Sequence, residues 1–293
     1  MNKKKVVVGA VGALASVALS GCVTNEEPAL PEGWSEPNVD EVPEIAAMYQ
    51  DADGVLTVGT NPPFAPFEFK DSDGSLIGLE MDLANAVAQV MGLKFQPVEQ
   101  DFSMILPAVQ SGQIDLGGSG FTDTDERREN FDFVDILYAG IQWAELTDGP
   151  NKVDPSNPCG LTVAVQRTTV SETDDLRPKQ EACDGDLTIL PYDTSDNAAL
   201  AVLMGRADAL SADSPVSAWA VNRSDGRMSM VGEMFDAAPY GFAVPKDSEL
   251  GPAVAAALQH LIDTGAYAEI LDKWGVTEGL VEHAMINERP IND

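Results

Sequence analysis

The chain has 293 residues, of which 44% are hydrophobic and 22% are charged. This composition is ordinary for a globular protein, and it excludes wholesale disorder, a collagen-like repeat and a polytopic membrane protein. Seventeen lysines and arginines stand against 48 aspartates and glutamates, which gives a formal net charge of −31. A surface this negative repels phosphate backbones, so we expect no nucleic-acid partner.

Residues 1–21 are typical of an export signal rather than of a folded segment. A lysine-rich start precedes an uncharged apolar run, residues 6–21, which is too short to span a bilayer comfortably. The run ends in Leu-Ser-Gly followed by Cys22, an order that resembles the bacterial lipobox. In proteins with that motif the signal peptide is cut before the cysteine, whose sulfur then carries a diacylglycerol. We therefore expect Cys22 to anchor the protein by lipid on the extracytoplasmic face of the cell membrane. The alternative is a plain secretory signal that ends near a cysteine by chance.

Residues 22–50 are expected to form an acidic tether. They contain four prolines, many acids and no lysine or arginine, and such a stretch cannot bury enough apolar surface to fold alone. Residues 43–49 differ, since a proline at the start and an acid in the first turn favour a short helix that docks on the body.

Two cysteines remain after Cys22, and they are predicted to form a disulfide. Cys159 and Cys183 are a pair in a chain that carries an export signal, where disulfides persist. A metal or redox site is the alternative. It is disfavoured because there is no C-x-x-C motif and the only histidines, His260 and His283, lie far along the chain. We expect no metal and no cofactor.

The body alternates short apolar strands with amphipathic helices. The expected strands are residues 56–59, 95–98, 114–117, 161–165, 188–190 and 207–210. The expected helices are residues 80–91, a helix capped by Ser103 and stopped by Gly112, residues 171–182, residues 196–204, and two closing helices around Gly265. This alternation predicts mainly parallel sheets covered by helices, in two similar α/β units.

An ordered series of motifs makes the prediction more specific. The series consists of Asn61-Pro62-Pro63-Phe64-Ala65-Pro66-Phe67-Glu68-Phe69, Gly78-Leu79-Glu80-Met81-Asp82-Leu83, Phe102-Ser103, residues 107–115, Thr122-Asp123-Thr124-Asp125-Glu126-Arg127, Phe131-Asp132-Phe133, Arg206-Ala207-Asp208-Ala209 with Asp213, and residues 240–246. In this order the series resembles the family 3 extracellular solute-binding proteins, the polar amino-acid receptors of ABC importers. The resemblance runs from about Leu56 to Gly275.

The resemblance implies a two-lobed periplasmic-binding-protein-like fold of type II. Two strands would cross between the lobes, and the ligand would bind in the cleft between them. Lobe 1 would comprise residues 51–140 and 242–293, and lobe 2 would comprise residues 141–241. Binding at the carboxyl ends of strands is also what open α/β sheets favour.

The carboxylate of an amino-acid ligand needs a forked donor and backbone amides. Arg127 lies at the position of the family's carboxylate-clamping arginine, and the resemblance places Thr122 beside it. Thr169 precedes a helix whose first N–H groups would be free for an anion, and its family counterpart also contacts the carboxylate. Without the family context, Arg127 could equally form a surface ion pair in its acid-rich helix.

The ammonium group of such a ligand needs an anion and carbonyl oxygens. Asp213 matches the family's ammonium-binding aspartate, and the backbone around Ser119 and Gly120 would complete the cage. Taken alone, Asp213 could instead cap the helix that begins at Ser214 and Pro215.

Phe64 and Phe102 match the aromatic walls of the family's ligand site. In the family these walls sandwich the aliphatic part of the ligand. Taken alone, both side chains could be ordinary core residues, which is the usual fate of phenylalanine in a globular protein.

The side-chain specificity is the least determined part of the site. Asn61 stands where receptors for basic amino acids of this family usually have aspartate, so a cationic side chain would lose one anionic partner. Gln166 and Glu68 remain candidates for contact with the ligand side chain. These residues favour a neutral polar amino acid such as glutamine.

We therefore expect a lipid-anchored, monomeric receptor that closes on a free amino acid and delivers it to membrane permease subunits, with no catalytic residues. Two alternatives share the fold. One is a sensor that passes ligand occupancy to a membrane signalling protein, and the other is an enzyme like the cyclohexadienyl dehydratases. The enzyme is disfavoured because the sequence lacks an obvious acid–base pair with histidine.

Overall fold

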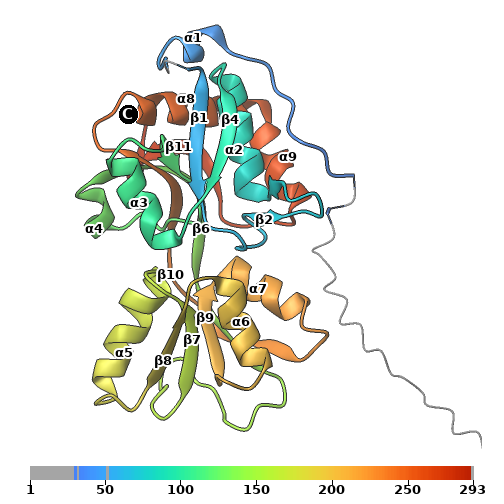
Figure 1. Cartoon of the computed structure of the whole chain (residues 1–293), viewed down its shortest axis with the longest axis vertical. Coiled ribbons are helices and arrows are strands. Elements are labelled where there is room, and N and C mark those ends of the chain that lie inside the picture. The colour runs from blue at the N-terminus through green and yellow to red at the C-terminus, as the bar shows by residue number, and fades with distance from the viewer. Residues whose placement is uncertain (1–29, 32, 51–52, 292–293) are drawn as a thin grey trace, which may run out of the picture.

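Helices and strands of the chain form two α/β lobes, one above the other in Figure 1. The computed structural model describes residues 30–31, 33–50 and 53–291. Lobe 1 contains α1 (Pro43–Ala46), β1 (Val55–Thr60), β2 (Phe69–Lys70), β3 (Leu76–Ile77), α2 (Leu79–Val90), β4 (Lys94–Glu99), α3 (Phe102–Gln110), β5 (Leu116–Gly117), α4 (Asp125–Arg128), α8 (Leu250–Thr264), α9 (Ala266–Lys273), β11 (Leu280–Ile286) and β12 (Arg289–Pro290). Lobe 2 contains β7 (Thr162–Gln166), the π-helix η1 (Ser171–Leu176), α5 (Arg177–Ala182), β8 (Thr188–Tyr192), α6 (Ser195–Leu203), β9 (Ala209–Asp213) and α7 (Ser214–Asn222).

Two long strands, β6 (Phe131–Leu146) and β10 (Met228–Pro245), run through both lobes. They pair antiparallel along most of their length, with register shifts between residues 231 and 241. The strand order is β4-β1-β5-β10-β6-β9-β7-β8, so these two strands join the parallel strands of lobe 1 to those of lobe 2. The lobe boundaries expected at 140/141 and 241/242 fall inside the two crossing strands. The α/β fold with two crossing strands is the one that the sequence predicts.

Each lobe buries an apolar core between its strands and helices. In lobe 2, Trp143 and Val163 are fully buried with Leu176 and Leu187. In lobe 1 the helices α2, α8 and α9 pack their apolar faces together, as their 3.6-residue periodicity requires. The largest apolar cluster continues from lobe 1 into lobe 2, and β6 and β10 are the strands that run from one lobe into the other.

The elements lie close to their expected positions, with four differences. The third helix begins at Phe102 with Asp101 in the N-cap position, so Ser103 does not cap it. The segment expected as a single helix from 171 is a π-helix followed by α5. The strand expected at residues 114–117 is β5, which is only two residues long. The C-terminal hairpin β11–β12 was not expected.

Part of the expected tether packs on lobe 1 instead of extending away from it. We call residues 34–49 the N-terminal strap. The indole nitrogens of Trp34 in the strap and of Trp274 both donate to Asp82, each at 2.8 Å. The backbone N–H of Val42 donates to the carbonyl of Val90 at the end of α2. The strap therefore belongs to lobe 1, and α1 lies within it, as expected for residues 43–49.

An aromatic contact joins the two lobes next to the strap. The ring of Trp219, on α7 of lobe 2, lies 6.2 Å from the ring of Phe69 on β2 of lobe 1. Phe69 in turn lies 5.6 Å from Trp274. Trp219 and Phe69 therefore form a contact across the lobe boundary.

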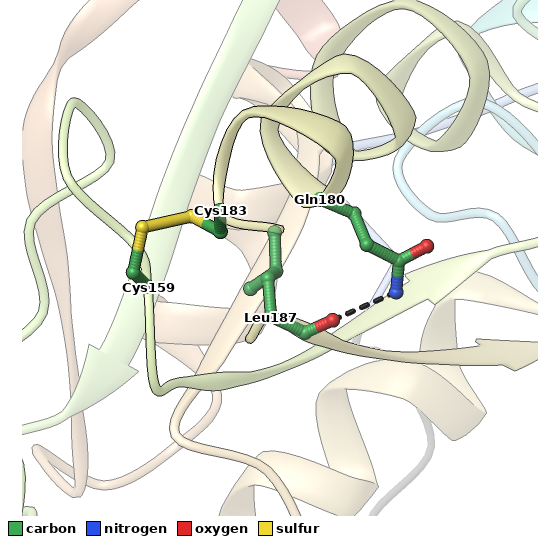
Figure 2. Close-up of a disulfide and its surroundings, with 4 residues drawn as sticks. All are labelled: Cys159, Gln180, Cys183 and Leu187. Atoms are coloured by element: carbon green, nitrogen blue, oxygen red, sulfur yellow. Dashed lines mark hydrogen bonds between the residues drawn. A yellow bond between two sulfur atoms is a disulfide. The ribbon is translucent and has the colours of Figure 1, made fainter. Parts of the chain in front are cut away.

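Cys159 and Cys183 form a disulfide in lobe 2, as the cysteine count predicts. The bond ties the loop before β7 to the end of α5, as Figure 2 shows. Beside it, Gln180 donates to the carbonyl of Leu187 at 2.7 Å. The expected signal peptide and Cys22 lie outside the described residues. No helix in the described part of the chain has both the length and the apolar character needed to cross a membrane.

Candidate functional site

A small cavity lies where the two lobes meet, and about 250 Å3 in and around it is free of protein atoms, part of it open solvent. Its lining consists of Phe64, Phe102, Ser119, Gly120, Thr122, Arg127, Gln166, Thr169, Val170 and Asp213. Nine of these ten residues are candidates from the sequence, and Val170 is the addition. The remaining candidates, Asn61 and Glu68, are not among the lining residues and are considered below.

The topology explains why distant residues meet here. Asn61 follows β1, and Ser119 lies two residues beyond β5, both in lobe 1. Gln166 ends β7 and Asp213 ends β9, both in lobe 2. Parallel strands bring their carboxyl ends to one edge of a sheet, and the two edges face each other across the cleft. The sequence motifs therefore gather by the ordinary geometry of α/β sheets.

Arg127 presents an unpaired cation to the cavity. Its backbone N–H is capped by Thr124 at the start of α4, and its Nη1 donates to the carbonyl of Thr122 at 2.8 Å. The guanidinium lies 5.5 Å from the ring centre of Phe121. Burial lowers the pKa of Arg127, and the charge of Asp213 is the largest influence that opposes this shift. No ion pair of Arg127 is found among the described residues, so the surface-ion-pair alternative does not hold.

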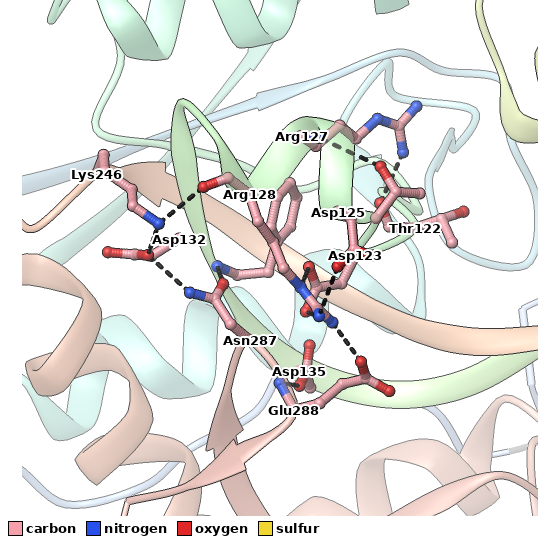
Figure 3. A network of polar contacts seen from close by, with 12 residues as sticks. Thr122, Asp123, Asp125, Arg127, Arg128, Asp132, Asp135, Lys246, Asn287 and Glu288 are labelled. Atoms are coloured by element: carbon pink, nitrogen blue, oxygen red, sulfur yellow. Dashed lines mark hydrogen bonds and ion pairs between the residues drawn. The ribbon is translucent and has the colours of Figure 1, made fainter.

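The neighbouring arginine makes the ion pairs instead (Figure 3). Arg128 binds Asp123 through Nε and Nη2 at 2.6 and 2.8 Å, and it binds Glu288 on the C-terminal hairpin at 2.5 Å. Burial and the charge of Asp123 raise the pKa of the nearby Asp135 to about 8. The network holds α4 in place through Arg128 and leaves the neighbouring guanidinium of Arg127 without an ion pair to any described residue.

Asp213 is a half-buried carboxylate that makes no ion pair with any described residue. It occupies the N-cap position of α7, but its side chain makes no capping hydrogen bond. The alternative role as a helix cap is therefore not used. Burial raises the pKa of Asp213 to about 6, while Tyr240 and the charge of Arg127 lower it. The Tyr240 hydroxyl approaches Asp213 without meeting hydrogen-bond geometry.

Ser119 and Gly120 form the part of the lining contributed after β5. Gly120 has a φ of +62°, and a Cβ at this position would lie 2.5 Å from the ring of Phe64. Ser119 donates its hydroxyl to Glu68, and the Gly120 N–H donates to Glu80. Glu68 is fully buried and does not line the cavity, so it is not placed for the ligand contact considered from the sequence.

Phe64 and Phe102 are both core residues and cavity walls. Their exposed fractions are 4% and 8%. Phe64 stacks on Phe67 with ring centres 5.4 Å apart, and Phe102 stacks on Phe121 at 4.6 Å. Their positions are therefore fixed by packing before any ligand arrives.

Asn61 and Gln166 hydrogen-bond to each other across the lobe boundary. Gln166 Nε2 donates to Asn61 Oδ1 at 2.8 Å, and Ser195 donates to Gln166 Oε1 at 2.7 Å. The Asn61 amide nitrogen donates to the carbonyl of Gln100. Both amide side chains are thus satisfied within the protein, and Thr169 likewise donates its hydroxyl to the Gln166 carbonyl.

The arrangement suits a zwitterion. A free guanidinium and a half-buried carboxylate share one small cavity, and the lining contains no histidine or cysteine. Within the ranges that the structure describes, no group of three or more His, Cys, Asp or Glu side chains is placed to hold a metal.

Comparison with known proteins agrees with this geometry. The sequence model of the bacterial extracellular solute-binding proteins, family 3, matches residues 56–277. The chain belongs to this family. It is 60% identical over 297 aligned residues to the arginine-binding protein ArgT of Corynebacterium glutamicum, covering 99% of this chain and 98% of the relative. It is 31% identical to the L-arginine-binding protein of Pseudomonas aeruginosa, covering 76% and 88%.

Solved structures give the same fold. An ancestral arginine-binding protein bound to arginine has a TM-score of 0.71 and 34% identity, covering 75% of this chain and 98% of that one. An ancestral amino acid-binding protein that is a precursor of cyclohexadienyl dehydratase has a TM-score of 0.69 and 32% identity, covering 76% and 96%. The curated relatives are named as binding proteins. Their names do not support our preference for a glutamine-like ligand, which rested mainly on Asn61.

Proposed function

We propose that this protein is the substrate-binding component of an ABC importer and that its ligand is L-arginine. The observation that carries the proposal is the interlobe cavity that the unpaired guanidinium of Arg127 and the half-buried carboxylate of Asp213 both line. The α-carboxylate would bind Arg127 and the α-ammonium would bind Asp213. The 60% sequence identity to ArgT, which extends over nearly the whole chain, then favours arginine among the amino acids.

The electrostatics also favour a cationic ligand. An open groove adjoins the cavity, shares Phe102, Arg127 and Val170 with it, and is lined by exposed acids that include Glu126 and Asp174. With a net charge of −31, the protein raises the local concentration of cations and repels anions. With Asn61 in place of an aspartate, the site has one negative charge fewer, but the surrounding protein remains strongly negative.

Binding would proceed by hinge closure. The cavity leaves only about 10 Å3 for the centre of a water-sized molecule, so an amino acid would enter only when the lobes separate around β6 and β10 and the Asn61–Gln166 bond opens. The protein would then release arginine to permease subunits in the membrane. Lipidation of Cys22 would keep it on the extracytoplasmic face of that membrane, at the permease.

Isothermal titration calorimetry with a panel of amino acids tests the ligand assignment. We expect L-arginine to bind tightest, and citrulline and glutamine to bind at least tenfold more weakly, because both lack the side-chain charge. Citrulline is the matched probe, since it replaces the guanidinium by a neutral group of the same shape. Tighter binding of glutamine than of arginine would refute the arginine assignment, and no binding of any amino acid would refute the receptor role.

A further inference from the structure

The Ser119–Gly120 segment is held from beneath by two buried glutamates. Ser119 Oγ donates to Glu68 Oε1 at 2.5 Å and itself accepts from the Asn61 N–H at 3.1 Å. The Gly120 N–H donates to Glu80 Oε2 at 2.8 Å. Both glutamates are fully buried in lobe 1 and neither lines the cavity. They touch the lining residues without being able to touch the ligand.

The geometry of a peptide group shows what this contact does. The Ser119–Gly120 bond is trans, so its C=O and N–H point in opposite directions. Since the N–H points down to Glu80, the Ser119 carbonyl points to the other side, where Ser119 lines the cavity. That carbonyl accepts no hydrogen bond from any residue in the described ranges. It is a free acceptor aimed at the ligand space.

The stability of the fold does not explain why glutamate occupies either position. Glu68 Oε2 and Glu80 Oε1 are buried without a hydrogen-bond partner, and so is the Tyr240 hydroxyl near them. No lysine or arginine pairs with either carboxyl group in the part of the chain that the structure describes. Burying such groups costs free energy that an apolar side chain would not cost. A polar side chain kept at this cost needs a role beyond packing.

We propose that Glu80 is a positioning residue for amino-acid recognition: by holding the Gly120 N–H, it turns the Ser119 carbonyl toward the cavity to accept a hydrogen bond from the α-ammonium group. Glu68 supports the same segment by fixing the Ser119 side chain. This inference rests on the proposed function, because it assigns a second partner to the ammonium group beside Asp213. It places part of the ligand selectivity in residues that the ligand never contacts.

Two conservative variants separate positioning from charge. Burial raises the pKa of Glu80 to about 8, so Glu80→Gln keeps an acceptor oxygen at the same reach and resembles the neutral acid. Glu80→Asp keeps an ionisable carboxyl group but is one methylene shorter, so it cannot reach the Gly120 N–H without a backbone shift. If Glu80 positions the peptide, Gln should retain arginine affinity within about fivefold. Asp should lose roughly 10- to 100-fold, the usual effect of one hydrogen bond to a charged group. If only charge matters, the order is reversed.

The probes are L-arginine and 5-guanidinopentanoic acid, which is arginine without the α-amino group, each titrated by calorimetry into purified protein. The loss of affinity in Glu80→Asp should appear for arginine and be less than threefold for the analogue. The analogue has no ammonium group to donate a hydrogen bond to the Ser119 carbonyl. An equal loss for both ligands would overturn the proposal, since general disruption of the cavity would then explain it. Asp82→Asn is the matched control. Asp82 is two residues further along the same helix, and its buried carboxyl group accepts hydrogen bonds from Trp34 and Trp274. The control variant should change the affinity for neither arginine nor the analogue.

The outcomes distinguish failure of the proposed receptor function from failure of the positioning role of Glu80. If the wild-type protein fails to bind arginine, the proposed function fails and these variants are not needed. If the wild type binds arginine but Gln loses affinity and Asp keeps it, the positioning role alone is wrong. Should Glu80→Asp not fold, as judged by its melting temperature, the Gln variant still decides, since loss of its preference for arginine over the analogue contradicts positioning.

Discussion

Asp213→Asn should stabilise the unliganded protein while weakening its ligand binding. Burial raises the pKa of Asp213 from 3.8 to about 6. At 1.36 kcal/mol per pKa unit, the ionised carboxylate costs the empty folded state about 3 kcal/mol. Because the folded-state pKa is raised, the folded protein binds more protons than the unfolded chain between about pH 4 and 6. This residue's contribution to stability is therefore lost as the pH rises through that window.

Asparagine has no such cost, so the variant should be matched with wild type near pH 4 and more stable above pH 6. The gain at pH 7 should approach 3 kcal/mol, or roughly 6–12 °C in melting temperature for a protein of this size. Thermal denaturation followed by circular dichroism at pH 4 to 8, without ligand, measures the difference. Asp73→Asn is the control, since Asp73 is exposed and has no burial cost to relieve.

Ligand binding should change in the opposite direction. An α-ammonium group favours the ionised carboxylate, so wild-type affinity for arginine should fall about tenfold per pH unit below pH 6, and Asp213→Asn should remove that slope. A stability difference between variant and wild type that is the same at pH 4 and pH 7 would refute this reasoning. So would an asparagine variant that is less stable at pH 7, since the carboxylate would then be favourably placed without a ligand.

Three further outcomes are expected. Arg127→Ala should weaken arginine binding by roughly a thousandfold, because an unpaired buried carboxylate costs about 3–5 kcal/mol, and Arg127→Lys should restore it only in part; wild-type affinity in calorimetry would contradict the clamp. Cys159 and Cys183 should resist a maleimide probe in the folded protein until a reductant is added, and labelling before reduction would contradict the disulfide. Cys22→Ser should move the protein from the membrane fraction to the soluble fraction without changing its affinity for arginine. Mutant protein that still pellets with membranes would contradict the lipid anchor.

The sequence predicted the lobes and the residues around the cavity because both follow from local patterns in a fixed order. Strand ends deliver Asn61, Gln166 and Asp213 to the cleft whatever the loops do, so their meeting requires only the topology. Asn61 shows the limit of such reasoning. Its amide is satisfied by Gln166 and by the backbone of Gln100, so its identity alone says little about the ligand side chain.

Features that depend on side-chain partners far apart in the sequence could not be predicted. Trp34 packs on lobe 1 because Asp82, 48 residues away, accepts its indole N–H, and nothing in the composition of residues 22–50 reveals that contact. The role of Glu80 was hidden for the same reason, because its position in a signature helix suggests packing rather than a contact with Gly120. Both contacts exist only once the chain is folded.

The interlobe stacking of Trp219 on Phe69 gives the protein a built-in optical reporter. The chain has four tryptophans: Trp34 and Trp274 are bound together within lobe 1, and Trp143 is fully buried in lobe 2. Only Trp219 faces across the boundary, so its indole passes from an aromatic contact to water when the lobes part. The emission spectrum of the unlabelled protein should therefore shift toward the red as the cleft opens, and its rate of change in a stopped-flow mixing experiment would time the closing motion itself.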